Sequence, residues 1–109
     1  MHFIRQSDRR NWNVYRSVSM DEFGQKRENL NIIDVREADE FAAGHIPGAV
    51  SMPLSGLAQE FETLKKDKEY HVICLSGGRS SMACDFLGNQ GYDVVNVMGG
   101  MSAWRGDIE

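Results

Sequence analysis

Short apolar runs alternate with polar, helix-forming segments along the whole chain. The run at 30–35 is mostly β-branched and apolar, which favours a strand that is covered on both faces of a parallel sheet. Polar or glycine-containing stretches bound each run, as expected where strands end in turns. The predicted strands are 14–18, 30–35, 70–74 and 93–97, with a shorter one after a turn within 45–52.

The segments between these runs predict short helices at 19–26, 37–43, 55–64, 80–90 and 101–105. Ser19 and Glu22 are spaced for a capping box at the first helix start. Gly44 is expected to end the second helix in a left-handed conformation, and Gly91 to close the fourth. Leu57, Phe61 and Leu64 fall on one face of the third.

Strands alternating with helices at this spacing predict an α/β fold with a central, mainly parallel five-stranded sheet flanked by helices on both faces. No repeat or low-complexity tract divides the sequence. We therefore expect a single domain over residues 1–109, with 1–12 as an N-terminal arm.

Composition and charge narrow the classes of partner. Of 109 residues, 41% are hydrophobic and 26% charged, which excludes fibrous and disordered classes. The net charge is -4, and although four Arg lie within residues 1–20, no basic face for nucleic acid is indicated. No apolar run approaches the roughly 20 residues of a membrane span, and the start lacks a signal-peptide pattern, so we expect a cytoplasmic protein. The two cysteines are expected to be free thiols, and no spacing matches a zinc site.

Residues 72–81 combine a strand end, a glycine pair and a helix start. Cys74 lies at the carboxyl end of its predicted strand, the edge at which open α/β sheets bind ligands. Gly77 and Gly78 let successive backbone N–H groups point at one centre, as in an anion-binding nest. Ser80 is expected to cap the helix whose positive end faces the same point.

These features, together with the guanidinium of Arg79, all favour negative charge on the Cys74 sulfur. We therefore expect a thiol pKa below its ordinary value of about 8.5 and a reactive thiolate near neutral pH. The alternative is that Cys74 is only a small buried hydrophobic residue at a strand end. The glycines and Arg79 favour the reactive thiol.

Four short motifs now point to one family. In this order they resemble the rhodanese (sulfurtransferase) family, and the resemblance extends over the chain from about Val14 to Trp104. The motifs are IDVRE at 33–37, GHIPGA at 44–49, CLSGGRS at 74–80 and GGMSAW at 99–104.

The resemblance implies a rhodanese-like fold in which Cys74 takes a sulfane sulfur from a small anionic donor such as thiosulfate. The sulfur would be held as a persulfide and passed to cyanide, a thiol or a protein acceptor. No metal and no organic cofactor are expected, and neither nucleic acid nor a membrane as partner. One alternative is a binding or regulatory module of the same fold without turnover.

A second, less favoured alternative is a phosphatase or arsenate reductase of related fold. Four residues separate Cys74 from Arg79, which resembles the sulfurtransferase loop, whereas the related phosphatases use a loop one residue longer. Leu75 stands where thiosulfate-using relatives often carry a charged residue, so the natural donor stays open. Ser76 either donates its hydroxyl to bound sulfur or stabilises the loop. Arg79 either binds an anionic donor or locks the loop by pairing with an acid.

Three residues outside the loop are expected to support it. The resemblance implies that Asp34 and Arg36 form a structural pair near the active edge, where Asp34 can also accept amide hydrogens from a neighbouring turn. His45 is expected to anchor Asp34 or the next turn rather than to act as a general base.

Several residues near the loop are expected to fill the core. Cys84 is interpreted as core rather than as a resolving thiol, because more than two helical turns separate it from the loop. Met82, Phe86 and Leu87 are assigned to the same buried helix face, and Trp104 to packing of the last helix.

Overall fold

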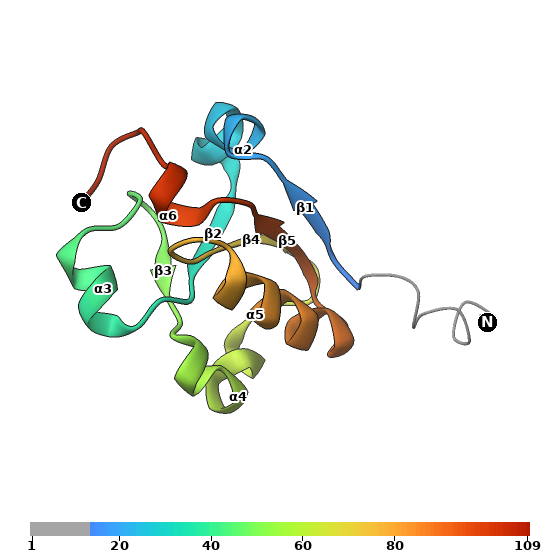
Figure 1. The fold of residues 1–109 in the computed structure, drawn as a ribbon. Coiled ribbons are helices and arrows are strands. Elements are labelled where there is room, and N and C mark those ends of the chain that lie inside the picture. The colour runs from blue at the N-terminus through green and yellow to red at the C-terminus, as the bar shows by residue number, and fades with distance from the viewer. Residues whose placement is uncertain (1–13) are drawn as a thin grey trace.

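The computed structural model describes residues 14–109, which form one five-stranded sheet with helices around it (Figure 1). All its strand pairs are parallel, and the order across the sheet is β1-β5-β4-β2-β3. The predicted α/β fold is confirmed, and the N-terminal arm predicted at 1–12 lies outside the described residues. The strands are β1 (Arg16–Val18), β2 (Asn31–Asp34), β3 (Val50–Ser51), β4 (Glu69–Ile73) and β5 (Asp93–Val97).

The helices are short, as the sequence predicts. Ser19 caps the first, because its hydroxyl accepts a hydrogen bond from the backbone N–H of Glu22 at 3.1 Å. Three further turns of 3₁₀ helix occur at Arg27–Asn29, Leu54–Gly56 and Phe61–Thr63. The α-helices are α2 (Met20–Lys26), α3 (Ala38–Ala43), α4 (Leu57–Glu60), α5 (Gly78–Asn89) and α6 (Gly100–Ala103).

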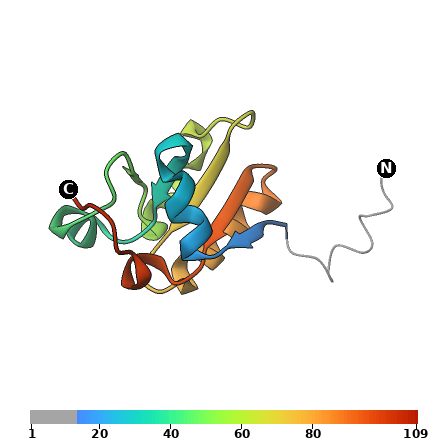
Figure 2. The ribbon, with the colours of Figure 1, turned by 90° about the horizontal axis from the view of Figure 1, so that it is seen from above.

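The sheet is covered on both faces, each by its own apolar cluster. In one cluster, Leu57 of α4 and Leu87 of α5 pack with β-strand residues such as Val72. In the other, Phe23 of α2 packs with strand residues and with the partly buried Trp104. Figure 1 shows α5 in front of the strands, and Figure 2 shows α2 lying across them. The packing role predicted for Trp104 is confirmed by an edge-on contact with the Phe23 ring at 5.8 Å between centroids.

Three local predictions are wrong. The helix predicted over 55–64 is broken into a short α4 flanked by two 3₁₀ turns. The first break falls at Gly56, whose backbone (φ -109°, ψ 4°) is outside the α-helical region, and the second at Glu60, which stays in the right-handed region with φ -115° and ψ -11°. Gly44 ends α3, but with φ 159° and ψ 130° its backbone is not in the left-handed helical conformation. Met82 is 63% exposed, because it lies on the outer side of α5 and not on its buried face.

Parallel strands bring their carboxyl ends to one edge of the sheet. Asp34 pairs with Ile73, so the last residue of β2 lies beside the residue that precedes Cys74. Val72 pairs with Asn96, which places β5 on the other side of β4. The fold thus gathers the ends of β2, β4 and β5 around Cys74. Among residues 14–109, no helix has the length and apolar character needed to cross a membrane.

Candidate active site

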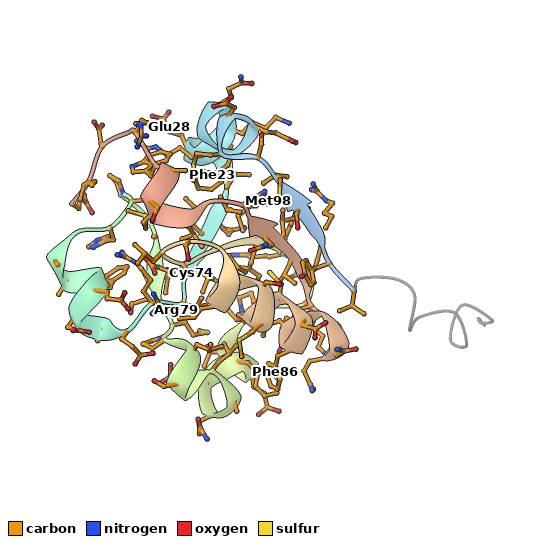
Figure 3. The ribbon with its side chains drawn as sticks, viewed as in Figure 1. Phe23, Glu28, Cys74, Arg79, Phe86 and Met98 are labelled. Carbon is orange, nitrogen blue, oxygen red and sulfur yellow. The ribbon has the colours of Figure 1, made fainter. Side chains whose placement is uncertain are left out.

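Cys74 follows directly on β4, at the point where the chain turns into α5. Figure 3 shows Cys74 and Arg79 on the side of α5 that faces α3. Cys74 is 1% exposed, so its sulfur lies at the bottom of the turn and not on its rim. The backbone N–H of Val35 donates to the carbonyl of Ile73 at 3.0 Å, which fixes the strand end that carries the cysteine.

The loop after Cys74 directs backbone hydrogens at the sulfur. Gly77 adopts φ 113°, in the left-handed region that glycine enters without a Cβ clash, and it is the N-cap of α5. Its N–H donates to Cys74 Sγ at 3.1 Å. This confirms the predicted nest geometry at Gly77, while Ser80 is not the cap but lies within the first turn of α5. The reason is that the helix begins two residues earlier than predicted.

Burial and hydrogen bonding act on the Cys74 thiol in opposite directions. Burial raises its pKa, whereas hydrogen bonds from the Ser80 hydroxyl and from the backbone N–H groups of Ser80, Gly77 and Ser76 lower it. The lowering prevails, so the pKa of Cys74 lies below its ordinary value. The site therefore favours a thiolate, the nucleophilic form of cysteine.

A buried polar network lies behind the sulfur, and the sequence analysis missed half of it. Ser80 Oγ lies 3.3 Å from Cys74 Sγ and 2.6 Å from Oδ1 of Asn96. Asn96 is a polar residue among the buried valines of β5 and is itself only 7% exposed. A polar residue inside an otherwise apolar central strand is the signal that could have identified it, because buried polar groups need partners.

Arg79 pairs with an acid rather than standing alone beside the sulfur. Its two terminal nitrogens donate to the two carboxylate oxygens of Glu40 at 2.6 and 3.0 Å. This geometry matches the loop-locking alternative. Hydrogen bonds from Arg79 and from the backbone N–H of Glu37 hold the pKa of Glu40 down at about 2. Sequence reasoning missed Glu40, although its position in the first turn of α3 marked it as a capping residue.

Asp34 and Arg36 form a buried ion pair under the loop edge. Arg36 donates from Nη2 to Asp34 Oδ2 at 2.8 Å, and Nε lies within 3.1 Å of both carboxylate oxygens. Asp34 also accepts from the backbone N–H of Arg36, as the turn prediction anticipated. Because Arg36 reaches the carbonyl of Gly44 at 2.8 Å as well, the pair joins the end of β2 to the end of α3.

His45 anchors a different turn from the one first considered. Its ring stacks on Phe41 with 3.7 Å between centroids, and Nδ1 lies 2.8 Å from the carbonyl oxygen of Phe41. Nε2 lies 3.7 Å from a carboxylate oxygen of Glu109. None of these contacts reaches Asp34 or the Cys74 loop, so the described residues place His45 outside the sulfur's surroundings.

The last helix holds the back of the loop. The backbone N–H groups of Met101 and Ser102 donate to the carbonyls of Cys74 and Leu75 at 2.7 and 2.8 Å. Gly100 makes this approach feasible, since a Cβ there would lie 2.3 Å from the Cys74 carbonyl oxygen. The motif GGMSAW thus supports the loop, a role that the sequence analysis did not assign to it.

The remaining predicted residues divide between rim and core. Leu75 is 44% exposed and Ser76 and Gly78 are also exposed, so these three form the outer side of the loop. Cys84 is fully buried, and burial raises its pKa to about 12. This matches the interpretation of Cys84 as core.

The fold and this loop define a class of protein. The family described as the rhodanese-like domain matches residues 19–107, and the chain belongs to that family. Its relatives include the "Putative sulfurtransferase YtwF" of Bacillus subtilis (strain 168), 51% identical over 82 residues that cover 75% of this chain and 80% of that protein. Thiosulfate sulfurtransferase GlpE of Pseudomonas putida (strain GB-1) is 37% identical over 74% of each chain. A crystal structure of a rhodanese-related protein from Thermoplasma volcanium covers 87% of this chain and 98% of its own, with a TM-score of 0.83 and 33% identity.

Proposed function

We propose that this protein transfers sulfane sulfur through a persulfide on Cys74. One observation carries the proposal: Cys74 Sγ is held at the base of a turn where Gly77 N–H donates to it at 3.1 Å. Fixed dipoles aimed at one atom stabilise negative charge without having to reorganise. The same dipoles suit the thiolate before transfer and the anionic persulfide after it.

In the first half-reaction, Cys74 receives a sulfur atom from the donor. With thiosulfate as donor, the Cys74 thiolate attacks the outer sulfur, the S–S bond of thiosulfate breaks, and its electron pair leaves with sulfite. The product is a persulfide with its negative charge on the terminal sulfur. Leu75, which is exposed on the loop, has no charge, and Arg79 is paired with Glu40. The described loop itself therefore has no unpaired cation that could bind the donor. We infer that the donor is recognised mainly through backbone N–H groups.

In the second half-reaction, the Cys74 persulfide passes its terminal sulfur to an acceptor. An acceptor nucleophile, either cyanide or a thiolate of a small molecule or protein, attacks the terminal sulfur, and the S–S bond to Cys74 breaks. Thiocyanate or the acceptor's persulfide leaves, and the Cys74 thiolate is restored. The cycle has the two-step form of covalent nucleophilic catalysis and requires no cofactor.

Mass spectrometry of the intact protein tests the proposal. Incubation with thiosulfate or 3-mercaptopyruvate is expected to add the mass of one sulfur atom, and subsequent cyanide to remove it as thiocyanate. Cys74→Ser should lose the added mass, while Cys84→Ala should keep it, because Cys84 is buried with its pKa raised to about 12. No labelling from either donor, or labelling that survives Cys74→Ser, would contradict the proposed function.

A further inference from the structure

The Ser80 hydroxyl has more partners than it can serve in one orientation. Its Oγ lies 2.6 Å from Asn96 Oδ1, 3.2 Å from the carbonyl oxygen of Gly77 and 3.3 Å from Cys74 Sγ. A hydroxyl has a single hydrogen to donate and two lone pairs to accept with. With Cys74 as a thiol, the hydrogen of Ser80 points to Asn96, the nearest acceptor, and Ser80 Oγ accepts the S–H.

Ionisation of Cys74 reverses the direction of the hydrogen bond between Cys74 and Ser80. The thiolate has no hydrogen left and must accept one, so the Ser80 hydroxyl turns toward the sulfur. That rotation leaves Ser80 Oγ and Asn96 Oδ1 as two oxygens 2.6 Å apart with no hydrogen between them. Turning the Asn96 amide by half a rotation replaces Oδ1 by Nδ2, which donates to Ser80 Oγ and removes the conflict.

The three side chains lie where such a change has a large effect. Cys74, Ser80 and Asn96 are 1%, 0% and 7% exposed, so little water competes for their hydrogen bonds. In a buried network each hydrogen bond polarises the next, and one wrongly oriented donor is costly. Asn96 is also held in place, because β5 is paired with β1 on one side and with β4 on the other.

We propose that Asn96 is a positioning residue: its amide flips as Cys74 loses its proton and thereby directs the Ser80 hydroxyl at the sulfur. The inference rests on the proposed function in taking the Cys74 thiolate as the nucleophile. The terminal sulfur of a persulfide would leave Cys74 Sγ without a proton as well, so Asn96 would keep the same orientation through the transfer.

A double-mutant cycle tests the proposal. The rate of Cys74 alkylation by iodoacetamide is measured against pH, with the modified peptide located by mass spectrometry. Asn96→Asp replaces an amide by a group that, when ionised, only accepts, and so holds the Ser80 hydrogen away from the sulfur. We expect this change to raise the alkylation midpoint by about one pH unit more with Ser80 present than in the Ser80→Ala background.

The cycle separates orientation from charge. The added carboxylate repels the thiolate through space in both backgrounds, and that effect cancels in the comparison. The influence of Arg79 and Cys84, two described ionisable groups that interact electrostatically with Cys74, cancels in the same way. Asn31→Asp, an exposed change at the opposite edge of the sheet, should leave the midpoint unchanged. Equal shifts in the two backgrounds would overturn the proposal.

The unaltered protein provides a second measurement if Asn96→Asp does not fold. The side-chain amide resonances of Asn96 are expected to change with the same midpoint as Cys74 alkylation, and to stay constant over that range in Cys74→Ser. Asn96 resonances that do not change as Cys74 ionises would overturn the proposal. Neither measurement uses a sulfur donor. If the protein were not labelled with a persulfide, the proposed function would be refuted, but the proposal for Asn96 would still be tested by these two measurements.

Discussion

Gly100 is a residue of the last helix that has no room for a side chain beside the Cys74 loop. A Cβ built on it would lie 2.3 Å from the carbonyl oxygen of Cys74 and 2.6 Å from that of Leu75. Its φ of 55° is also in the region that side chains rarely adopt. Both neighbours are backbone atoms that cannot rotate away, so the contact can only be relieved by moving the loop.

Gly100→Ala is therefore expected to displace the loop and to destabilise the protein by about 2 kcal/mol or more. Urea unfolding measures the stability, and alkylation of Cys74 reports whether the sulfur still reacts as a thiolate. The expected pattern is a lower unfolding midpoint together with slower alkylation near neutral pH, because the amide directed at the sulfur is lost with the loop conformation.

Gly24→Ala is the matched control for this change. Gly24 lies inside α2, where the nearest atom to a built Cβ belongs to Trp104 at 3.9 Å, an ordinary contact. Alanine in a helix interior is more favourable than glycine by about 0.5–1 kcal/mol, so this variant should be slightly more stable. Similar losses in the two variants would show that the Gly100 contact has no special importance.

Sequence reasoning found the residues of the site that are neighbours in the chain. The loop of Cys74, Gly77 and Arg79 follows from a strand end, a glycine pair and a helix start within a few positions. Glu40 and Asn96 were missed because they reach the loop from α3 and β5, and only the folded sheet edge brings them there. Local pattern contains no information about such pairs beyond the presence of a polar residue that needs a partner.

At the scale of elements, the ion pair between Arg79 and Glu40 joins α5 to α3. Figure 3 shows Arg79 on the side of α5 that faces α3. Glu40 also accepts from the backbone N–H of Glu37, so it closes the start of α3 at the same time. The pair thus restrains the first turn of α5, which contains Ser80.

Glu40→Gln should lower stability only where Glu40 is charged. Because the folded-state pKa of Glu40 is lowered from 4.5 to about 2, its contribution is present above pH 4.5 and is lost as the pH falls toward 2. Melting temperatures of the variant and the original protein should therefore differ at neutral pH and converge in acid. Glu62→Gln, at an exposed carboxylate, should show no such pattern, and a gap for Glu40→Gln that is independent of pH would contradict the ion-pair explanation.

Elements were predictable where pattern and burial agree. The three central strands, β2, β4 and β5, were found because their Val and Ile runs are buried on both faces of the sheet, whereas the edge strands β1 and β3 are mostly exposed. The predicted helix at 55–64 had the right buried face but the wrong geometry: Leu57, Phe61 and Leu64 do share one core, yet the backbone between them is partly 3₁₀. Phe61 packs edge-on against Phe86 and Tyr92, contacts with residues distant in the sequence that a local pattern does not contain.

At the scale of the whole molecule, the site and the core make different demands on the central strand β4. One end of β4 leads into Cys74 and the loop that follows it, while His71 lies within the strand, buried between β2 and β5. Nδ1 of His71 is buried without a hydrogen-bond partner among the described residues. Its ring lies 6.0 Å from that of Phe23, on the face covered by α2. In this place a charged imidazole costs more free energy to bury than a neutral one.

The last prediction follows from this burial, which lowers the pKa of His71. His71 in the unfolded chain takes up a proton below about pH 6.5, whereas in the folded protein it does so only at lower pH. The free energy of unfolding therefore decreases as the pH is lowered below about 6.5, until the folded-state pKa is passed. The slope contributed by one group cannot exceed about 1.4 kcal/mol per pH unit. Urea unfolding between about pH 7 and pH 5 measures it, above the range in which Glu40 titrates.

His71→Phe keeps a planar ring and removes the titration, so it should flatten the pH dependence over this interval. His45→Gln is the matched control: His45 is only partly buried and its change leaves His71 intact, so the acid-dependent loss should persist. If His71→Phe packs poorly, its stability will be lower at every pH, but the slope of its free energy of unfolding against pH still tests the prediction. A slope unchanged by His71→Phe would mean that a different group takes up the proton on unfolding, and that the unpartnered nitrogen of His71 carries no cost.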